Sequence, residues 1–392
     1  MFTSMFIIGI LLNLSTKMSE ALLSLYAKSV GAPADQIGTL MSMFAMTALV
    51  FRFVAGPAMN AYNRKLILQI AMILFGVAYS GFGISTFISK FTGINIIFVL
   101  MFFRLLQGVG SAFGNACLLT IVSDCIPKES FSSGIGVFAL AQTVAQAFGP
   151  TVGVYLKDVF GYNNTYLITA VIVLASIILI AITAKVLDTG TGKLVFDLNN
   201  MVAKEALIPA LIMFLISFGF TSINAFFLVY AEEKGISGAS YYFTVNAIAL
   251  MATKPLVGKL NDKYGFVRVA LPACLLTAVS LVLIGYSTKL WHLLAVALIN
   301  SFGYGAIQPA LQSICMKSVP VSKRGSASST NYIALDSATL FGPAVCGVVA
   351  NIFGYVPMMW IVMTIPVMFA FVATLVYREK LNTIENDFLK NT

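Results

Sequence analysis

Long apolar stretches, separated by short polar segments, recur along the whole chain. A helix needs about 20 apolar residues to cross the roughly 30 Å core of a bilayer, and each stretch has about that length. The pattern predicts an all-α membrane protein with twelve transmembrane helices, at residues 5–27, 36–59, 66–87, 94–117, 130–156, 165–186, 206–230, 239–260, 267–287, 291–316, 325–349 and 356–377.

Composition agrees with this interpretation. Hydrophobic residues make up 59% of the 392 residues and charged residues only 10%, which is far from the usual balance of a soluble domain. The first stretch lacks the basic segment and the A-x-A cleavage site of a secretion signal, so we interpret it as the first span. No room remains for a sizeable soluble domain.

Basic residues are distributed unequally between the predicted connections. Connections after even-numbered spans, together with the C-terminal tail, hold 15 Lys and Arg residues, whereas those after odd-numbered spans hold 5. An excess of basic residues marks the cytoplasmic side. We therefore expect both termini in the cytoplasm, and a multi-pass protein of the inner (cell) membrane of a bacterium.

Sequence landmarks recur at a fixed offset in the two halves of the chain. Pro127, Gly149-Pro150 and Phe160-Gly161-Tyr162 reappear 193 residues later as Pro320, Gly342-Pro343 and Phe353-Gly354-Tyr355. Such self-similarity indicates an internal repeat. Repeats of six spans insert in the same orientation, which predicts two pseudo-symmetric six-helix bundles at residues 1–187 and 205–392, the second with a short cytoplasmic tail, joined by a cytoplasmic linker at 188–204.

Polar residues inside the spans follow one face of every third helix, at spacings of three or four residues. They are Asn13, Lys17, Glu20 and Ser24 in the first span, Arg104, Gln107, Ser111 and Asn115 in the fourth, Ser217, Thr221 and Asn224 in the seventh, and Asn300, Tyr304, Gln308 and Gln312 in the tenth. Gln142, Gln146 and Tyr332 are further candidates in the fifth and eleventh spans.

A charge at the bilayer centre costs about 2.5–3.5 kcal/mol on insertion scales. The charged members of these stripes therefore need a cavity or a partner, and the four stripes together predict a central hydrated cavity of substrate size. The alternative is that the amides only bond one helix to another.

Residues suited to catalysis or metal binding are not grouped in the sequence. The five cysteines are scattered without a C-x-x-C pair, and the single His292 stands beside Trp291 at the start of a span. The chain has no P-loop pattern, and its basic residues form no continuous patch for nucleic acid. We expect a monomer that is not an enzyme, with no cofactor or metal and no nucleic-acid partner, in contact with the lipid bilayer, a small-molecule substrate and protons.

Three motifs resemble those of the major facilitator superfamily, and the resemblance covers nearly the whole chain. The segment GKLNDKYGF from Gly258 is similar to that family's loop signature G-x-x-x-D-[RK]-x-G. Arg104-Leu-Leu-Gln107-Gly108-Val-Gly110 resembles its fourth-span pattern R-x-x-Q-G-x-G, and Gly149-Pro150-Thr-Val-Gly153 resembles its antiporter motif G-P-x-x-G.

The resemblance implies two bundles that rock about a site near the midplane, lined by helices 1, 4, 7 and 10. It also implies that the loop carboxylate, here Asp262 between Gly258 and Gly265, pairs with nearby bases and holds one facing state. The candidate bases are Lys263, Arg268 and Lys254.

The first-half copy of the loop motif runs from Gly56 to Arg64 and departs from the family. Asn60 replaces the aspartate and Asn63 replaces a glycine. Because Asn60 has no charge, an equivalent charged clamp is not expected in this half.

The Gly-Pro motif of the fifth span has a physical reason. Pro150 removes a backbone donor and kinks a helix, while Gly149 and Gly153 allow a neighbouring helix to come close. A hinge-like contact and ordinary tight packing are both consistent with this pattern. Its recurrence as Gly342-Pro343 favours a shared mechanical role, and the family's association of the motif with exporters favours efflux.

Our hypothesis for energy coupling is that Glu20 or Asp336 takes up and releases a proton during transport, with Lys17 or Arg104 acting on that carboxylate. The alternatives are a static i, i+3 ion pair for Lys17 and Glu20 and a helix–helix hydrogen bond for Asp336. We expect proton-coupled efflux of a small organic compound, a drug or a metabolite, by alternating access. Uptake by substrate–proton symport is the alternative that the sequence leaves open.

Overall fold

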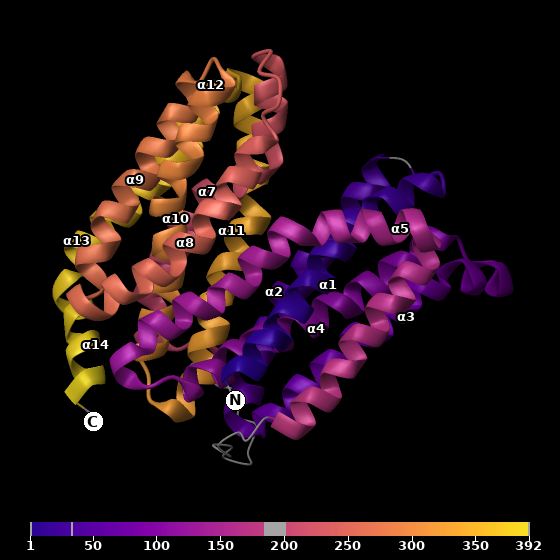
Figure 1. Cartoon of the computed structure of the whole chain (residues 1–392), viewed down its shortest axis with the longest axis horizontal. Helices are drawn as coiled ribbons and strands as arrows, with labels where there is room; N and C mark the ends of the chain where they lie inside the picture. The colour runs from indigo at the N-terminus through magenta and orange to yellow at the C-terminus, as the bar shows by residue number, and fades with distance from the viewer. Residues whose placement is uncertain (1, 33, 184–200, 391–392) are drawn as a thin grey trace. The chain divides into compact units, whose positions relative to one another are not determined.

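The computed structural model describes residues 2–32, 34–183 and 201–390, which form helices and short connections without a strand (Figure 1). The long helices of the first half are α1 (Phe2–Ser29), α2 (Ala34–Ala61), α3 (Arg64–Thr92), α4 (Ile96–Cys125) and α5 (Phe131–Thr183). The helices of the second half are α7 (Leu207–Glu233), α8 (Tyr241–Tyr264), α9 (Phe266–Tyr286), α10 (Leu290–Lys317), α11 (Arg324–Phe353), the short α12 (Tyr355–Met358), α13 (Thr364–Val376) and α14 (Arg378–Lys390).

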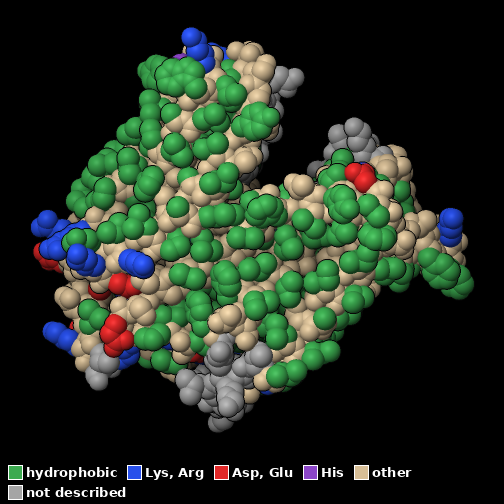
Figure 2. All heavy atoms as spheres, in the orientation of Figure 1, with side chains coloured by type: hydrophobic (Ala, Val, Ile, Leu, Met, Phe, Trp, Pro, Cys, Tyr) green, Lys and Arg blue, Asp and Glu red, His purple; other side chains and the backbone are tan. Residues whose placement is uncertain are grey.

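The predicted all-α membrane fold is confirmed. In the described part of the chain ten helical stretches are long and apolar enough to cross a membrane. One of them, Lys128–Ile182, contains all of α5 except its last residue, Thr183. Helices satisfy their own backbone hydrogen bonds, as lipid requires. Figure 2 shows hydrophobic side chains over most of the visible face, with Lys and Arg near its margins. The count of twelve spans stays a prediction.

Two repeated glycines adopt the same backbone conformation. Gly161 interrupts α5 with φ 77° and ψ 170°, and Gly354, 193 residues later, precedes α12 with φ 86° and ψ 171°. Glycine adopts positive φ readily because it has no Cβ atom. The sequence landmark therefore corresponds to a structural one, a sharp break between two consecutive helices in each half.

The junction between α2 and α3 differs from its counterpart between α8 and α9. Gly265 has φ 84° in the second half, whereas Asn63 has φ −61° and its side chain accepts a hydrogen bond from the N–H of Lys65 over 2.9 Å. Asn63 is thus an ordinary helix N-cap. This geometry explains why the first-half motif does not need a glycine at position 63.

By packing, the chain divides into two compact units that do not coincide with the two sequence halves. Unit 1 contains Met1–Cys125, Val144–Met201 and Val321–Ser329; unit 2 contains Ile126–Thr143, Val202–Pro320 and Thr330–Thr392. The start of α5 therefore packs within unit 2, and the start of α11 packs within unit 1. The predicted linker, residues 188–204, lies mostly outside the described residues.

Aromatic residues form much of the interior of unit 1. Phe75, Tyr79 and Phe82 on α3 are fully buried, and the ring of Phe82 lies 5.2 Å from that of Tyr166. In unit 2 one core cluster is mainly aliphatic and joins α7, α9 and α10, with Met213, Ile307 and Leu311 among its buried residues. These interiors fix the helices that carry the polar side chains described below.

Candidate functional site

A group of polar side chains joins α1, α3 and α4 inside unit 1. The Nζ of Lys17 donates to Oε2 of Glu20 over 2.7 Å. The Nη1 of Arg104 donates to Oε1 of Gln107 over 2.6 Å, and Nε2 of Gln107 donates to the hydroxyl of Tyr79 over 3.2 Å. We call these five residues the α1–α4 cluster. The polar stripes of the first and fourth spans, inferred separately from spacing, thus come together here.

Access to the cluster differs between its two ends. Arg104 and Gln107 are buried, whereas the side chains of Lys17 and Glu20 remain 32% and 30% exposed. Glu20 interacts electrostatically with Arg104 as well as with Lys17. The cluster therefore presents a reachable carboxylate close to two basic groups.

Arg104 also contacts an aromatic ring of α2. Its guanidinium carbon lies 4.6 Å from the centre of the Phe44 ring, a cation–π contact. The Nε of Arg104 is buried without a hydrogen-bond partner among the described residues. A buried donor without a partner costs free energy, so the cluster has spare hydrogen-bonding capacity that a bound molecule or water can use.

The Gly-Pro motif of α5 packs directly against the cluster. A Cβ atom at Gly149 would lie 2.6 Å from the Cβ of Lys17, while one at Gly153 would lie 3.4 Å from the Cα of Met18. The distance at Gly149 is shorter than Cβ atoms approach other atoms in real structures, whereas the distance at Gly153 is an ordinary van der Waals contact. Gly149 is therefore the residue that lets α5 approach the helical turn carrying Lys17.

Other residues predicted to line a cavity in unit 1 bond locally on their own helices. The Nδ2 of Asn13 donates to the carbonyl of Gly9 over 2.8 Å, and the Nδ2 of Asn115 donates to Oγ of Ser111 over 3.1 Å. These contacts match the alternative that some amides serve helix packing.

The predicted residues of unit 2 mostly join neighbouring helices. Nδ2 of Asn300 donates to Oγ of Ser280 on α9 over 2.9 Å, and the hydroxyl of Thr221 donates to the carbonyl of Ala338 on α11 over 3.3 Å. Tyr304 stacks on Phe220 with 3.6 Å between ring centres. Among the other candidates, Gln308 and Gly342 are buried, Gln142, Tyr332 and Pro343 are half-buried, and Gln146 and Pro150 are exposed. The side chain of Asn224 lies outside the described residues.

The second predicted carboxylate, Asp336, is half-buried on α11 in unit 2 and interacts with its surroundings. Glu20 lies in unit 1. The two carboxylates singled out from the sequence therefore belong to different units, and Glu20 is the one that belongs to the α1–α4 cluster.

The loop carboxylate Asp262 caps a helix. Its Oδ1 accepts from the backbone N–H of Ser132 over 2.8 Å, and its Oδ2 accepts from that of Ser133 over 2.7 Å, both in the first turn of α5. A Cβ atom at Gly258 would lie 2.7 Å from the Cα of Ser133, so this glycine allows the approach. A carboxylate at a helix N-terminus also interacts favourably with the helix dipole. Asp262 and Gly258 thus join α8 of the second sequence half to α5 of the first.

The three bases expected to pair with Asp262 have other positions. Lys254 is buried and donates to the carbonyl of Ala139 on α5 over 3.3 Å. Lys263 is exposed, with its Nζ 5.1 Å from the centre of the Tyr264 ring, and Arg268 is also exposed. In the described part of the chain Asp262 forms its hydrogen bonds with backbone amides and no ion pair with these bases.

The first-half counterpart of Asp262, Asn60, makes a different contact with a helix start, because it donates to a side-chain hydroxyl and accepts from no backbone amide of the described residues. Nδ2 of Asn60 donates to Oγ of Ser326 near the start of α11 over 2.5 Å, while its Oδ1 has no partner among the described residues. A Cβ atom at Gly325 would lie 2.7 Å from that Oδ1. The contact exists without a charge, in line with the departure of Asn60 from the family motif.

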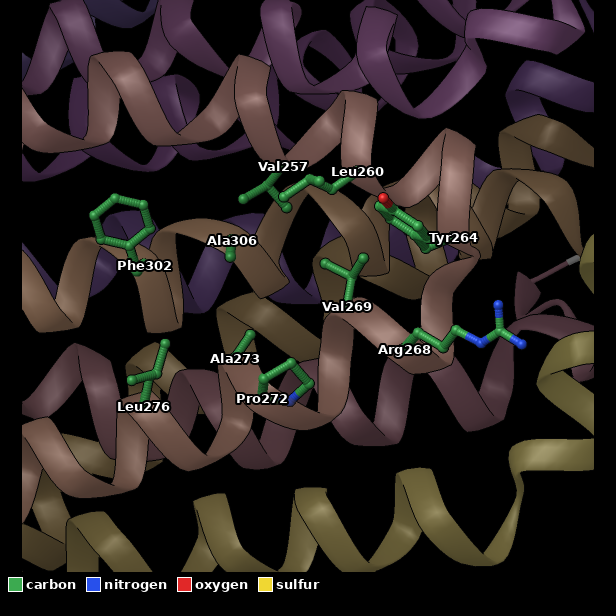
Figure 3. Close-up of a pocket in the computed structure, with 10 residues that line it drawn as sticks. All are labelled: Val257, Leu260, Tyr264, Arg268, Val269, Pro272, Ala273, Leu276, Phe302 and Ala306. Carbon is green, nitrogen blue, oxygen red and sulfur yellow. The ribbon is translucent and has the colours of Figure 1, made fainter.

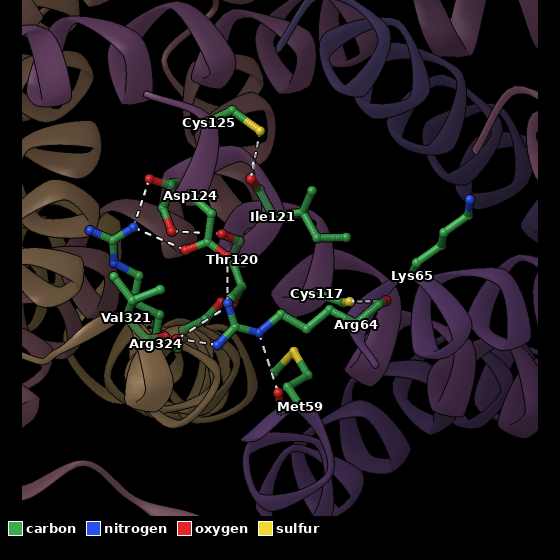
Figure 4. A network of polar contacts seen from close by, with 12 residues as sticks. Met59, Arg64, Lys65, Cys117, Thr120, Ile121, Asp124, Cys125, Val321 and Arg324 are labelled. Carbon is green, nitrogen blue, oxygen red and sulfur yellow. Dashed lines mark hydrogen bonds and ion pairs between the residues drawn. The ribbon is translucent and has the colours of Figure 1, made fainter. Parts of the chain in front are cut away.

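The negative charge near the start of α11 comes instead from Asp124, at the end of α4 (Figure 4). Its carboxylate forms an ion pair with Arg64 through Oδ2 and with Arg324 through Oδ1, the latter at 3.0 Å. The side chains of all three residues are at least 94% buried. Nη2 of Arg64 also donates to the carbonyl of Val321 over 2.8 Å. Sequence reasoning missed Asp124 because it placed the end of the fourth span at residue 117.

Helix α14 of unit 2 was also missed, since residues after 377 were predicted to be a short tail. Oε2 of Glu385 accepts from the N–H of Phe266 at the start of α9 over 2.7 Å, and Oε1 pairs with Lys317 over 2.9 Å. Phe388 packs edge-on against Phe131 with 5.0 Å between ring centres. The signal was the spacing of Leu381, Glu385 and Phe388, which places all three on one helical face.

Comparison with known proteins finds similarity to membrane transporters of one superfamily. The sequence profile of the Major Facilitator Superfamily matches residues 5–200 and 209–388. The chain is 24% identical over 374 residues to the staphylopine export protein of Staphylococcus aureus, covering 90% of each chain. It is 22% identical to multidrug resistance protein 2 of Bacillus subtilis, covering 83% of each. The crystal structure of the Escherichia coli fucose:proton symporter FucP superposes with a TM-score of 0.78 at 15% identity, covering 96% of this chain and 98% of that one.

Proposed function

Because this chain belongs to the major facilitator superfamily, we propose that it is a secondary transporter that exports a small organic compound in exchange for protons. The chain is a multi-pass membrane protein, and the likeness to FucP concerns the fold alone. Export, proton coupling and a cytoplasmic position of both termini are parts of the proposal.

The observation that carries the proposal is the ion pair of Lys17 with Glu20 beside Arg104. A carboxylate inside a membrane helix is costly unless it has a partner or faces a water-filled cavity, and such residues commonly mark functional sites. Here both charged groups of the pair are about one-third exposed, so either a proton or a substrate can reach them. Protonation of Glu20 would release Lys17, and the neighbouring Arg104 would favour return of the carboxylate to its charged form.

The direction of transport rests on two points. The relatives with the matches described above are named for staphylopine export and for multidrug resistance. In this chain the exporter-associated motif of α5 lies against Lys17 through Gly149, which provides a mechanical link between α5 and the proton-coupling candidate.

Alternating access requires contacts that hold one state and break in the other. We assign this role to two contacts that join the sequence halves: Asp262 on α8 with the first turn of α5, and Asp124 on α4 with Arg324 at the start of α11. The contact in unit 2 is the helix cap by Asp262, and the contact in unit 1 is the ion pair of Asp124 with Arg324. Opening then exchanges these partners for water, at a net cost of about 1.5–3 kcal/mol for each hydrogen bond to a charged group.

The test is a transport assay on the full chain. A growth and accumulation screen across toxic and metabolite-like compounds, with and without the gene, first identifies a substrate. Proton flux driven by that substrate is then measured in liposomes with a pH-sensitive dye. We expect Glu20→Gln to abolish the coupled flux and Asp158→Asn, a change at an exposed carboxylate, to leave it unchanged.

Two results would overturn the proposal. Full coupled flux in both Glu20→Gln and Asp336→Asn would exclude these carboxylates as the proton carriers. Movement of substrate and protons in the same direction would replace export by symport.

A further inference from the structure

Helices α8, α9 and α10 of unit 2 enclose a groove with a volume of about 310 Å³ (Figure 3). Its wall is mostly apolar and includes Pro272 and Leu276 of α9 and Phe302 of α10. The two residues with polar side-chain ends, Tyr264 and Arg268, lie together at one end of the groove, and Leu276 and Phe302 lie toward the other. The groove is therefore amphipathic along its length.

The groove is open to the surroundings of the protein. Phe302 is 47% exposed, Tyr264 46% and Leu276 38%. α9 and α10 are both long and apolar enough to cross a membrane, so exposed apolar residues on their surface face lipid tails. Tyr264 is the last residue of α8 and Arg268 lies in the first turn of α9. The polar end is thus at the level where helices leave the hydrocarbon core and headgroups begin.

The charge at this end is not neutralised within the described residues. The guanidinium of Arg268 has no hydrogen bond or ion pair there, and Lys259 and Lys263 on the last turns of α8 are exposed. Both oxygens of the adjacent carboxylate, Asp262, are already occupied by backbone amides of α5. A basic group at headgroup depth next to an apolar groove complements an anion that carries a hydrocarbon chain.

We propose that this groove binds an anionic phospholipid, with the upper part of one acyl chain along the apolar wall and the phosphate held by Arg268. The groove volume of about 310 Å³ suits a segment of one acyl chain and not a whole lipid. Arginine binds phosphate through two parallel N–H donors. The same charge disfavours an organic cation in this position. This site is separate from the α1–α4 cluster, and the inference does not depend on the direction of transport.

The experiment is native mass spectrometry of the full chain, purified in detergent and delipidated, then mixed with dioleoyl phosphatidylglycerol or dioleoyl phosphatidylcholine. These lipids share acyl chains and differ in net charge. We expect the unchanged protein to retain the anionic lipid preferentially. Arg268→Gln should lower that retention by about tenfold, because it removes a charge-assisted hydrogen bond to phosphate. Arg378→Gln, the same change at an exposed residue of α14 outside the groove, should have no effect.

A second variant tests the apolar part. Val269→Trp fills the groove from α9 and should reduce retention of both lipids, while a thermal unfolding midpoint close to that of the unchanged protein shows that the variant is folded. Equal retention of the two lipids, or full retention by Arg268→Gln, would overturn the proposal. Displacement of the lipid by inorganic phosphate alone would indicate a soluble-anion site instead. Displacement by tetraphenylphosphonium would indicate a site for organic cations.

Discussion

Gly149 on α5 and Lys17 on α1 lie so close together that a side chain at position 149 would come within 2.6 Å of the Cβ atom of Lys17. Lys17 in turn pairs with Glu20 over 2.7 Å. The position of α5 and the geometry of the ion pair are therefore coupled through one glycine, and this coupling can be tested without touching a charged residue.

We expect Gly149→Ala to impair transport. Crowding a well-packed interface costs about 1–3 kcal/mol, and here the strain falls on the turn that orients Lys17. Gly153→Ala is the matched control, because its nearest contacts are at an ordinary 3.4 Å. Transport is measured in liposomes at equal amounts of folded protein. If the two variants behave alike, the close approach at Gly149 has no special importance.

The helix cap at Asp262 predicts a graded response. Asp262→Ala removes both acceptors of the Ser132 and Ser133 amides and should destabilise the protein by about 1–2 kcal/mol. Asp262→Asn keeps one acceptor and should cost less. Thermal unfolding in detergent gives the order, with Asp158→Ala as the exposed control. A larger loss for Asn than for Ala would contradict the capping role.

A stronger effect is expected at Asp124, whose carboxylate neutralises two buried arginines. Asp124→Asn leaves Arg64 and Arg324 without a counter-charge, a change that costs about 3–5 kcal/mol for a buried pair. The midpoint of thermal unfolding should fall clearly, and Asp124→Asn combined with Arg324→Met should recover part of the loss. Equal stability of Asp124→Asn and the unchanged protein would show that the ion pairs of Asp124 with Arg64 and Arg324 do not stabilise the fold.

Helix α14 supplies a fourth prediction. Glu385→Gln retains an acceptor for the N–H of Phe266 but removes the charge that pairs with the buried Lys317. We expect a loss of about 1–3 kcal/mol, the cost of leaving a buried charged group unsatisfied. In the double variant with Lys317→Met the loss should be smaller than the sum of the single losses. Additive losses would mean that the two residues act independently.

Much of the fold followed from the sequence because its strongest signals are local. Apolar length placed the helices, and the 193-residue offset located Gly161 and Gly354, whose backbone conformations agree. The i, i+3 spacing of Lys17 and Glu20 also predicted their ion pair as one of two alternatives, and that contact lies within a single helical turn.

Contacts between distant segments were much less predictable. The partners of Asp262 are backbone amides, which every residue carries, so no side-chain pattern could identify them. Asp124 acts on Arg64 and Arg324 only because three helix ends meet. Nor could spacing show that Lys254 turns to a carbonyl of α5. Whether Glu20 or Asp336 carries protons stays a prediction.

The cap on α5 also has a consequence for biosynthesis. Asp262 follows Ser132 by 130 residues, so at 5–20 residues per second the ribosome completes α8 roughly 6 to 26 s after it has made the start of α5. During that interval the first turn of α5 has free N–H groups and no carboxylate to accept from them. The start of α5 therefore reaches its final arrangement only after α8 of the second half has been translated, and a chaperone or the insertion machinery has a defined period in which to protect that helix end.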